Sequence, residues 1–269
     1  MQKTLGGDQL KAWGWRIPFL IGALGSVVVV YLRRTLVETA SETDLYRKEA
    51  GSLANLLAHK RAVLLVLAFT GGGSLYFYTF TTYMQKFLVV SVGMPANSVS
   101  FVMTAALICF MLFQPLFGML ADRIGVRTHM LLFTGLAMVF VVPILFFLKT
   151  VTSPCAAFGG ILAALAIASF YTAVSGLAKA DLFTATVRAL GVGLPYAIAN
   201  TTFGGTAEYV ALWLRSADIE TGFFYYVAGL AALAFVASFL MPDLGKHGYL
   251  DGDGEIEANL GVRRAAARA

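Results

Sequence analysis

The sequence predicts an all-α membrane protein with seven transmembrane helices. Of its 269 residues, 58% are hydrophobic and only 13% are charged, and the mean hydropathy is +0.76. Soluble domains contain about 25% charged residues, so this composition excludes an ordinary soluble protein. Uncharged runs long enough to cross a bilayer also recur along the chain, between short charged segments.

Seven apolar segments follow one another, and we expect each to form one membrane-spanning helix. Trp13 and Trp15 precede the first segment and Tyr31 lies near its end, which is typical of the aromatic belts at membrane interfaces. The seven segments are 17–32, 62–83, 98–120, 129–148, 155–177, 189–212 and 222–241.

One long connection, 33–61, joins the first two segments. Its second part, 48–61, is expected to form a short amphipathic helix with Leu53, Leu56 and Leu57 on one face. The polar tail, 242–269, carries acidic and then basic residues and is predicted to be disordered. The first dozen residues lack an apolar core, so no signal peptide is predicted.

Lys and Arg residues predict the orientation. If 33–61, 121–128, 178–188 and the tail share one side of the membrane, that side holds most of the 20 Lys and Arg residues. The positive-inside rule makes this side cytoplasmic, with the C-terminus inside and the N-terminus outside. The net charge of +5 therefore indicates membrane topology and not nucleic-acid binding.

A short charged turn joins the third and fourth segments, which must be antiparallel neighbours. We expect Gly118 to let the two helices approach closely and Gly125 to permit the reversal. Asp122, Arg123 and Arg127 lie at headgroup depth, where they either anchor the turn on the positive side or bridge helix ends.

A second charged loop carries Asp181 and Arg188. Together with the charges of the first turn, they could form a cytoplasmic gate that closes in one conformational state. Single exposed ion pairs contribute only about 0–1 kcal/mol, so only a network would bias the equilibrium. The predicted gate residues are Gly118, Asp122, Arg123, Gly125, Arg127, Asp181 and Arg188.

Glu208 is the clearest ionisable residue within a predicted span. It either faces a water-filled cavity or reaches the outer interface beside Arg215. Tyr196 and Asn200 precede it in four-residue steps on one helix face. That face lines a polar cavity, or Asn200 bonds a neighbouring helix.

Hydroxyl side chains gather on the second predicted span, and a further pair follows on the fifth. Such a density of hydroxyl groups suits a site for a polar solute without permanent charge. If the solute is an anion, Lys86 and Arg215 could attract it at the outer mouth. The candidate cavity residues are Tyr76, Tyr78, Thr82, Gln85, Tyr171 and Ser175, with Tyr196, Asn200 and Glu208 on the sixth span. No metal cluster is predicted from Cys109, Cys155 and the histidines, and no pair with catalytic spacing lies within a span, which disfavours an intramembrane enzyme.

Several motifs together resemble the metabolite:proton symporter family of the major facilitator superfamily. The turn has the pattern G-x-x-x-D-R-x-G-x-R-T, which resembles the superfamily's loop between the eighth and ninth of twelve helices. The resemblance extends from Trp13 to Met241 and implies that the seven spans are helices 6–12 of a twelve-helix fold. The other motifs are 13–19, 78–86, 170–172, 187–193 and 203–209.

The resemblance implies a symporter that imports a dicarboxylate, 2-oxoglutarate, with protons across the bacterial inner membrane. The proton gradient would drive it without a cofactor, and its partners would be the bilayer and a missing N-terminal half. It also implies a domain order of the sixth helix (1–32), a central cytoplasmic loop (33–61) and a six-helix bundle (62–241), the bundle built from inverted repeats 62–148 and 155–241.

Two departures from the family pattern matter. Asp181 stands where the family has Glu, and Thr184 stands where it has Pro, so we expect a looser loop. The first five helices are absent, and with them the expected carboxylate-binding and proton-coupling residues. Two alternatives stay open: a same-family symporter of shikimate, citrate or a betaine, and a truncated fragment that cannot transport without an N-terminal half.

Overall fold

The computed structural model describes residues 12–35 and 52–242 and divides into two units, residues 1–45 and 46–269. Every regular element in the described ranges is a helix, so the predicted all-α class is confirmed there. The predictions for the tail beyond Pro242 and for most of the 33–61 connection concern residues outside these ranges.

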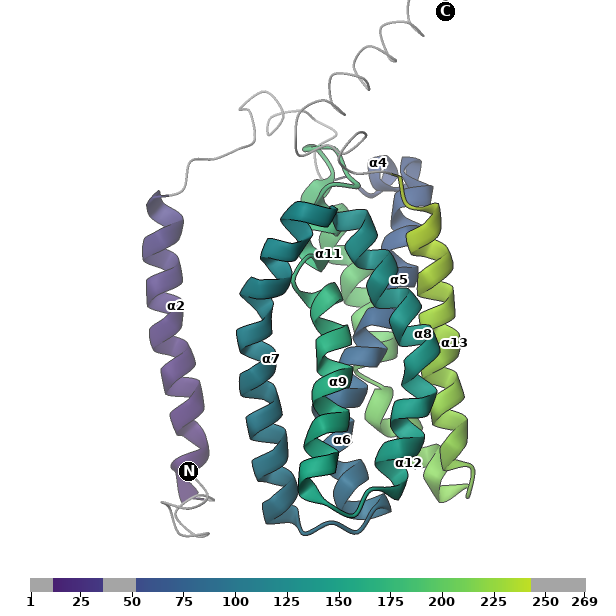
Figure 1. Ribbon diagram of the computed structural model, residues 1–269. Coiled ribbons are helices and arrows are strands. Elements are labelled where there is room, and N and C mark those ends of the chain that lie inside the picture. Colours follow the sequence, from purple (N-terminus) through teal and green to yellow (C-terminus); the bar gives the residue numbers. More distant parts are fainter. Residues whose placement is uncertain (1–11, 36–51, 243–269) are drawn as a thin grey trace, which may run out of the picture. The chain divides into compact units, whose positions relative to one another are not determined.

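The first unit contains a 3₁₀ turn, η1 (Gly14–Arg16), followed by helix α2 (Ile17–Thr35) (Figure 1). Its apolar part, Phe19–Leu32, is shorter than a full membrane span. Nearly all of its described side chains are exposed. A helix that is apolar all round needs lipid or protein around it, which fits a membrane location.

The second unit contains the remaining helices, several of which are interrupted by π-helical turns. A short helix, α4 (Leu53–Ala58), comes first. The first long helix consists of α5 (Lys60–Tyr78), the π turn η2 (Thr79–Tyr83), α6 (Met84–Lys86) and the π turn η3 (Phe87–Ser91). It is followed by α7 (Ala96–Ile124), α8 (Val126–Thr150), α9 (Pro154–Thr172), α10 (Ser175–Ala180), α11 (Arg188–Ala199), the π turn η4 (Asn200–Gly204), α12 (Ala207–Ser216) and α13 (Glu220–Leu240).

Five helices in the described residues are long and apolar enough to cross a membrane: Lys60–Ser91, Ala96–Ile124, Val126–Thr150, Pro154–Ala180 and Glu220–Leu240. The first predicted span is represented by the shorter α2. The sixth is interrupted by η4 and the turn after it, where the amide of Gly205 donates to the carbonyl oxygen of Asn200 at 2.8 Å. Five of the seven predicted spans are therefore long apolar helices.

Three consecutive glycines let α5 pack closely against three neighbours. A Cβ at Gly71 would lie 2.9 Å from the Phe203 ring of η4, and one at Gly72 would lie 2.7 Å from a backbone oxygen of α13. A Cβ at Gly73 would lie 2.5 Å from the ring of Tyr171 in α9. Small residues permit such approaches between membrane helices.

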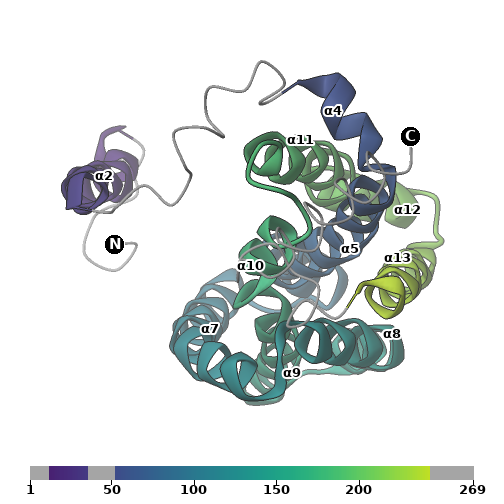
Figure 2. The ribbon, with the colours of Figure 1, turned by 90° about the horizontal axis from the view of Figure 1, so that it is seen from above.

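In the second unit, α5 and α9 each pack against two other long helices. Helix α5 contacts α13 and α11, whereas α9 contacts α8 and α7, and α8 also contacts α13 (Figure 2). At one end of the unit α7 meets α8, and α4 and residues 181–187 also lie there (Figure 1). We call this the turn end; the opposite end contains residues 92–95, 151–153 and 217–219.

Gly125 is the only residue between α7 and α8. Its φ of 84° lies in the left-handed region that favours glycine, so the predicted reversal at this position is confirmed. The prediction for Gly118 is wrong, because a Cβ there would meet no atom within 4 Å in the described chain.

The helices extend beyond their predicted ends because charged side chains at a bundle end can reach solvent while the backbone stays helical.

The predicted amphipathic helix in the first connection is present in part. Ser52 caps α4, since its hydroxyl oxygen accepts a hydrogen bond from the Asn55 amide at 3.1 Å. Only Leu56 is buried, while Leu53 and Leu57 are each 60% exposed. The three leucines lie at i, i+3 and i+4 in α4 and so share the predicted face, but the helix is only six residues long and buries just Leu56.

Candidate functional site

A groove of about 440 Å³ lies between the first long helix and the η4–α12 segment. Tyr78, Thr82 and Glu208 line it, so the structure brings together three of the predicted cavity residues. Thr82 lies in η2, and Gly204 in η4 packs against the Tyr78 ring, to which a Cβ would approach within 2.7 Å. π turns break the regular backbone pattern and frequently occur at functional sites.

Glu208 forms an ion pair with Lys86 at this groove. The sequence left two environments open for Glu208, a cavity or the outer interface beside Arg215. In the structure Glu208 lines the groove, and Arg215 pairs with Glu220. Gln85, on the same turn as Lys86, is exposed and lies 3.4 Å from the Ser100 hydroxyl of α7. A carboxylate, an ammonium group and hydroxyls thus share one partly open space.

Tyr76 lies in the core and not in the groove. Its ring is fully buried, with centroid distances of 4.8 Å to Phe80 and 5.6 Å to Phe133. Its hydroxyl donates a hydrogen bond to the carbonyl oxygen of Ala164 in α9 at 3.2 Å. In this conformation Tyr76 joins two helices.

Two further cavity candidates, Tyr171 and Tyr196, contact a lysine in the segment 178–188, which the sequence analysis treated as a loop. Lys179 belongs to α10, which continues the membrane-length helix, and it is only 4% exposed. Its Nζ lies 4.4 Å from the ring centroid of Tyr196 and 5.6 Å from that of Tyr171. The overlooked signal was spacing: Tyr171, Ser175 and Lys179 follow at four-residue intervals.

The predicted face of the sixth span is divided by η4. Tyr196 contacts Lys179 before the π turn, and Glu208 lines the groove after it. Asn200 is half-buried at the start of η4. Because a π turn contains an extra residue, the four-residue spacing that linked these side chains does not continue through it.

The predicted gate residues lie at the turn end. Nη2 of Arg127 donates to the carbonyl oxygen of Phe239 at 3.0 Å, and Nη2 of Arg61 donates to that of Leu240, also at 3.0 Å. Two arginines thus bind the last carbonyl groups of α13, where a helix terminus favours positive charge. Asp122 and Arg123 are exposed in the last turn of α7.

The other two gate candidates lie beside the loop between α10 and α11. Nε of Arg188 is 3.2 Å from the carbonyl oxygens of both Ala180 and Phe183, which fixes the loop against α11. Asp181 is buried and lines a cavity of about 250 Å³ together with Arg61.

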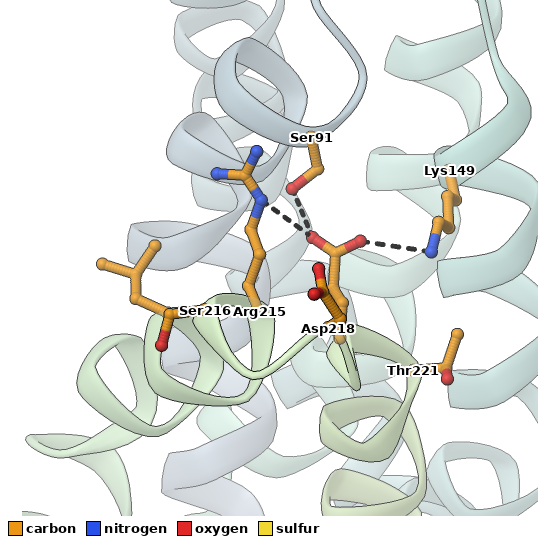
Figure 3. A pocket seen from close by; sticks show the side chains of 8 residues that line it. Ser91, Lys149, Arg215, Ser216, Asp218 and Thr221 are labelled. Atoms are coloured by element: carbon orange, nitrogen blue, oxygen red, sulfur yellow. Dashed lines mark hydrogen bonds and ion pairs between the residues drawn. The ribbon is translucent and has the colours of Figure 1, made fainter.

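An ion-pair cluster that the sequence analysis missed lies at the opposite end. The Glu220 carboxylate is 3.2 Å from Nζ of Lys149 and 3.7 Å from Nε of Arg215, and it accepts a hydrogen bond from Ser91 (Figure 3). Nη2 of Arg215 also donates to the carbonyl oxygen of Val90 at 2.8 Å. The cluster borders a cavity of about 530 Å³ and connects the ends of η3, α8, α12 and α13. The sequence held one signal for this cluster, since Lys149, Arg215 and Glu220 each lie at the end of an apolar run.

Comparison with known proteins shows the family. Over 246 residues the chain is 56% identical to alpha-ketoglutarate permease of Escherichia coli strain K12, which covers 91% of this chain and 57% of the permease. The chain belongs to the major facilitator superfamily. Within it, the motifs resemble those of the metabolite:proton symporter family, and the long apolar helices fit a multi-pass membrane protein.

Two further members extend the comparison. The inner membrane metabolite transport protein YhjE of E. coli K12 is 28% identical over 245 residues, with 87% of this chain and 55% of that protein covered. The citrate-proton symporter of Klebsiella pneumoniae is 30% identical over 213 residues, with 78% and 48% covered. The chain spans about half the length of the curated relatives it matches. No family model and no solved structure matches it.

Proposed function

We propose that this chain is the C-terminal portion of a proton-coupled symporter that imports 2-oxoglutarate or a similar dicarboxylate across the bacterial inner membrane. The observation that carries the proposal is the groove between two π turns, in a chain 56% identical to alpha-ketoglutarate permease. Hydroxyl groups of Tyr78 and Thr82 can donate to carboxylate oxygens, and Lys86 supplies a positive charge.

The Lys86–Glu208 ion pair provides a route for coupling protons to solute. While Glu208 is ionised, it neutralises Lys86 and competes with a solute carboxylate. A proton on Glu208 ends that competition and leaves Lys86 for the solute, so proton and dicarboxylate bind together. Reciprocal binding of this kind is the thermodynamic basis of coupling.

Alternating access would proceed by movement of the two halves about the solute site, with the turn end cytoplasmic. The helix packing supports the proposed repeats, 62–148 and 155–241. If each helix is replaced by its counterpart in the other repeat, the α5–α13 contact becomes the α9–α8 contact, and the α5–α11 contact becomes the α9–α7 contact. The proposed gate at the turn end would bring together the charged side chains of Asp122, Arg123, Arg127, Asp181 and Arg188 in another conformational state. In this one, Arg127 and Arg188 donate to backbone carbonyl oxygens. The N-terminal half that completes the cavity would come from the remainder of a longer protein.

A second candidate function is symport of a tricarboxylate. The 30% identity to the citrate-proton symporter supports it, because that relative also aligns with most of this chain. Its ligand has one more carboxylate, so it needs a further positive group in the cavity. Competition between the two acids distinguishes the candidates.

Uptake of radiolabelled 2-oxoglutarate tests the proposal. The chain is produced in cells without their own carrier, together with the N-terminal half of the E. coli permease. We expect uptake that a protonophore abolishes and that Glu208→Gln uncouples from the proton gradient. The matched control is Tyr209→Phe, a groove residue on the same helix. Membrane-inserted protein that takes up citrate but not 2-oxoglutarate would refute the proposed solute.

A further inference from the structure

Lys179 is a buried cation without an anion. Within the described residues its Nζ contacts only the rings of Tyr171 and Tyr196, and no carboxylate pairs with it. The nearest acidic residue in sequence, Asp181, lines the Arg61 cavity. Aromatic rings stabilise an ammonium group in part, but a charge removed from water also needs a partner of opposite sign.

Hydroxyl groups gather around Tyr171, one of the two rings that contact this lysine. Thr70, Ser74 and Ser175 all lie close to the Tyr171 hydroxyl. The hydroxyls of Tyr171 and Thr70 are buried, and within the described residues neither meets a partner at full hydrogen-bonding geometry. A buried ammonium group near hydroxyls that can donate to a carboxylate forms the lining expected of an anion site.

The two tyrosines differ in their freedom to move. Tyr171 is held in place, since its ring packs against Gly73 and lies 5.1 Å from the ring centroid of Phe133. Tyr196 is 41% exposed and covers Lys179 from α11. A rotation of Tyr196 therefore opens the lysine on the α11 side without disturbing the core.

A row of hydroxyl groups on α5 connects this position with the groove. Thr70, Ser74 and Tyr78 follow at four-residue steps on one face of α5. Thr82 lies in η2 and lines the same groove as Tyr78. Tyr78 and Thr82 line the groove beside Lys86, whereas Thr70 and Ser74 lie beside Tyr171. A lysine thus stands at either end of the row.

We propose that Lys179, with the hydroxyls of Tyr171 and Thr70, is a second site for a carboxylate group of the transported solute, nearer the turn end than the groove. This inference rests on the proposed function for the identity of the solute. The solute would pass from Lys86 along the hydroxyl row to Lys179, and Tyr196 would cover this second site.

Equilibrium binding tests the second site. The chain is purified with the N-terminal half of the E. coli permease, and the Kd for labelled 2-oxoglutarate is measured for wild type, Lys179→Met, Lys179→Arg and the control Lys60→Met, which alters an exposed lysine of α5. We expect Lys179→Met to raise the Kd at least tenfold, Lys179→Arg to restore part of the affinity, and Lys60→Met to change nothing. A folded Lys179→Met protein with wild-type Kd overturns the proposal.

A chemical readout separates this proposal from the proposed function. The modification rate of Lys179 by an amine-reactive reagent is followed by mass spectrometry, with succinate, with its dimethyl ester and without additive. Protection by succinate alone supports a carboxylate site even if wild type binds no 2-oxoglutarate, a result that would refute only the proposed solute. Equal rates in all three samples, or a Lys179→Met protein that loses thermal stability but keeps its Kd, would mean that Lys179 only holds α9 and α11 together.

Discussion

At the scale of single residues, the two carboxylate clusters differ in burial and therefore in expected role. The side chain of Glu208 is 29% exposed and pairs with an exposed lysine, whereas that of Glu220 is 12% exposed and meets two cations. An exposed pair contributes little to stability, while a buried charge that loses its partner is strongly destabilising. This difference agrees with the proposed coupling role of Glu208, and from it we predict a structural role for Glu220 at the opposite end.

For Glu208→Gln we expect a melting temperature close to that of the wild type, because the lost pair is worth about 0–1 kcal/mol. We also expect uptake to lose its dependence on external pH, since glutamine cannot release a proton. Thermal unfolding and uptake across a pH series measure the two effects. Uptake that retains the wild-type pH profile would remove Glu208 from the coupling mechanism.

For Glu220→Gln we expect a loss of about 1–3 kcal/mol, because Lys149 and Arg215 lose the carboxylate between them. Denaturation of the purified protein measures it. The matched control is Asp218→Asn at the same cavity, where φ is 59° and asparagine tolerates the left-handed conformation. A loss in the control as large as that in Glu220→Gln would contradict the structural role.

The residue scale also separates what the sequence could predict from what it could not. The reversal at Gly125 was predictable, since glycine readily adopts a positive φ. The spacing from Tyr171 placed Lys179 on one helix face, but its burial was not predictable, because a lysine near a helix end is ordinarily solvated and Tyr196 comes from another helix. The cluster of Glu220 was missed because Lys149 and Ser91 come from distant parts of the chain.

At the scale of elements, apolar length predicted the helices but not their interruptions. Hydropathy identifies where a helix can cross a bilayer, whereas π turns such as η2 and η4 depend on the packing of neighbouring helices. The predicted face from Tyr196 to Glu208 assumed a regular helix and therefore joined residues that the structure separates. Tyr76 was assigned to the cavity because sequence spacing cannot tell which face of a fully surrounded helix is wet.

The glycine triad gives a prediction at this scale. For Gly72→Ala we expect a loss of about 1–3 kcal/mol, since the new Cβ would lie 2.7 Å from the backbone oxygen of Leu230 and push α13 away from α5. The control is Gly118→Ala, whose Cβ meets nothing and which gains up to about 1 kcal/mol of helix propensity. Thermal stability in matched detergent measures both, and equal values would contradict the close packing.

At the scale of the whole molecule, we propose that the chain forms one side of the solute cavity. The family and the all-α class followed from composition and motifs, and the comparisons support both. The solute-binding machinery could be predicted only in part, because the chain aligns with 57% of the E. coli permease. We therefore expect uptake by cells that contain both halves and none by cells that contain this chain alone; equal uptake in the two strains would show that the chain assembles a complete cavity by itself.

The single residue between α7 and α8 has a mechanical consequence. With only Gly125 between them, the two helix ends at the turn stay together, so a shift of one helix along the membrane normal pulls on the other. The corresponding connection between α10 and α11 contains seven residues, 181–187, and a further break at residues 173–174 precedes α10. We therefore expect relative movement of these helices to be absorbed at the two breaks that flank α10, the helix that carries Lys179.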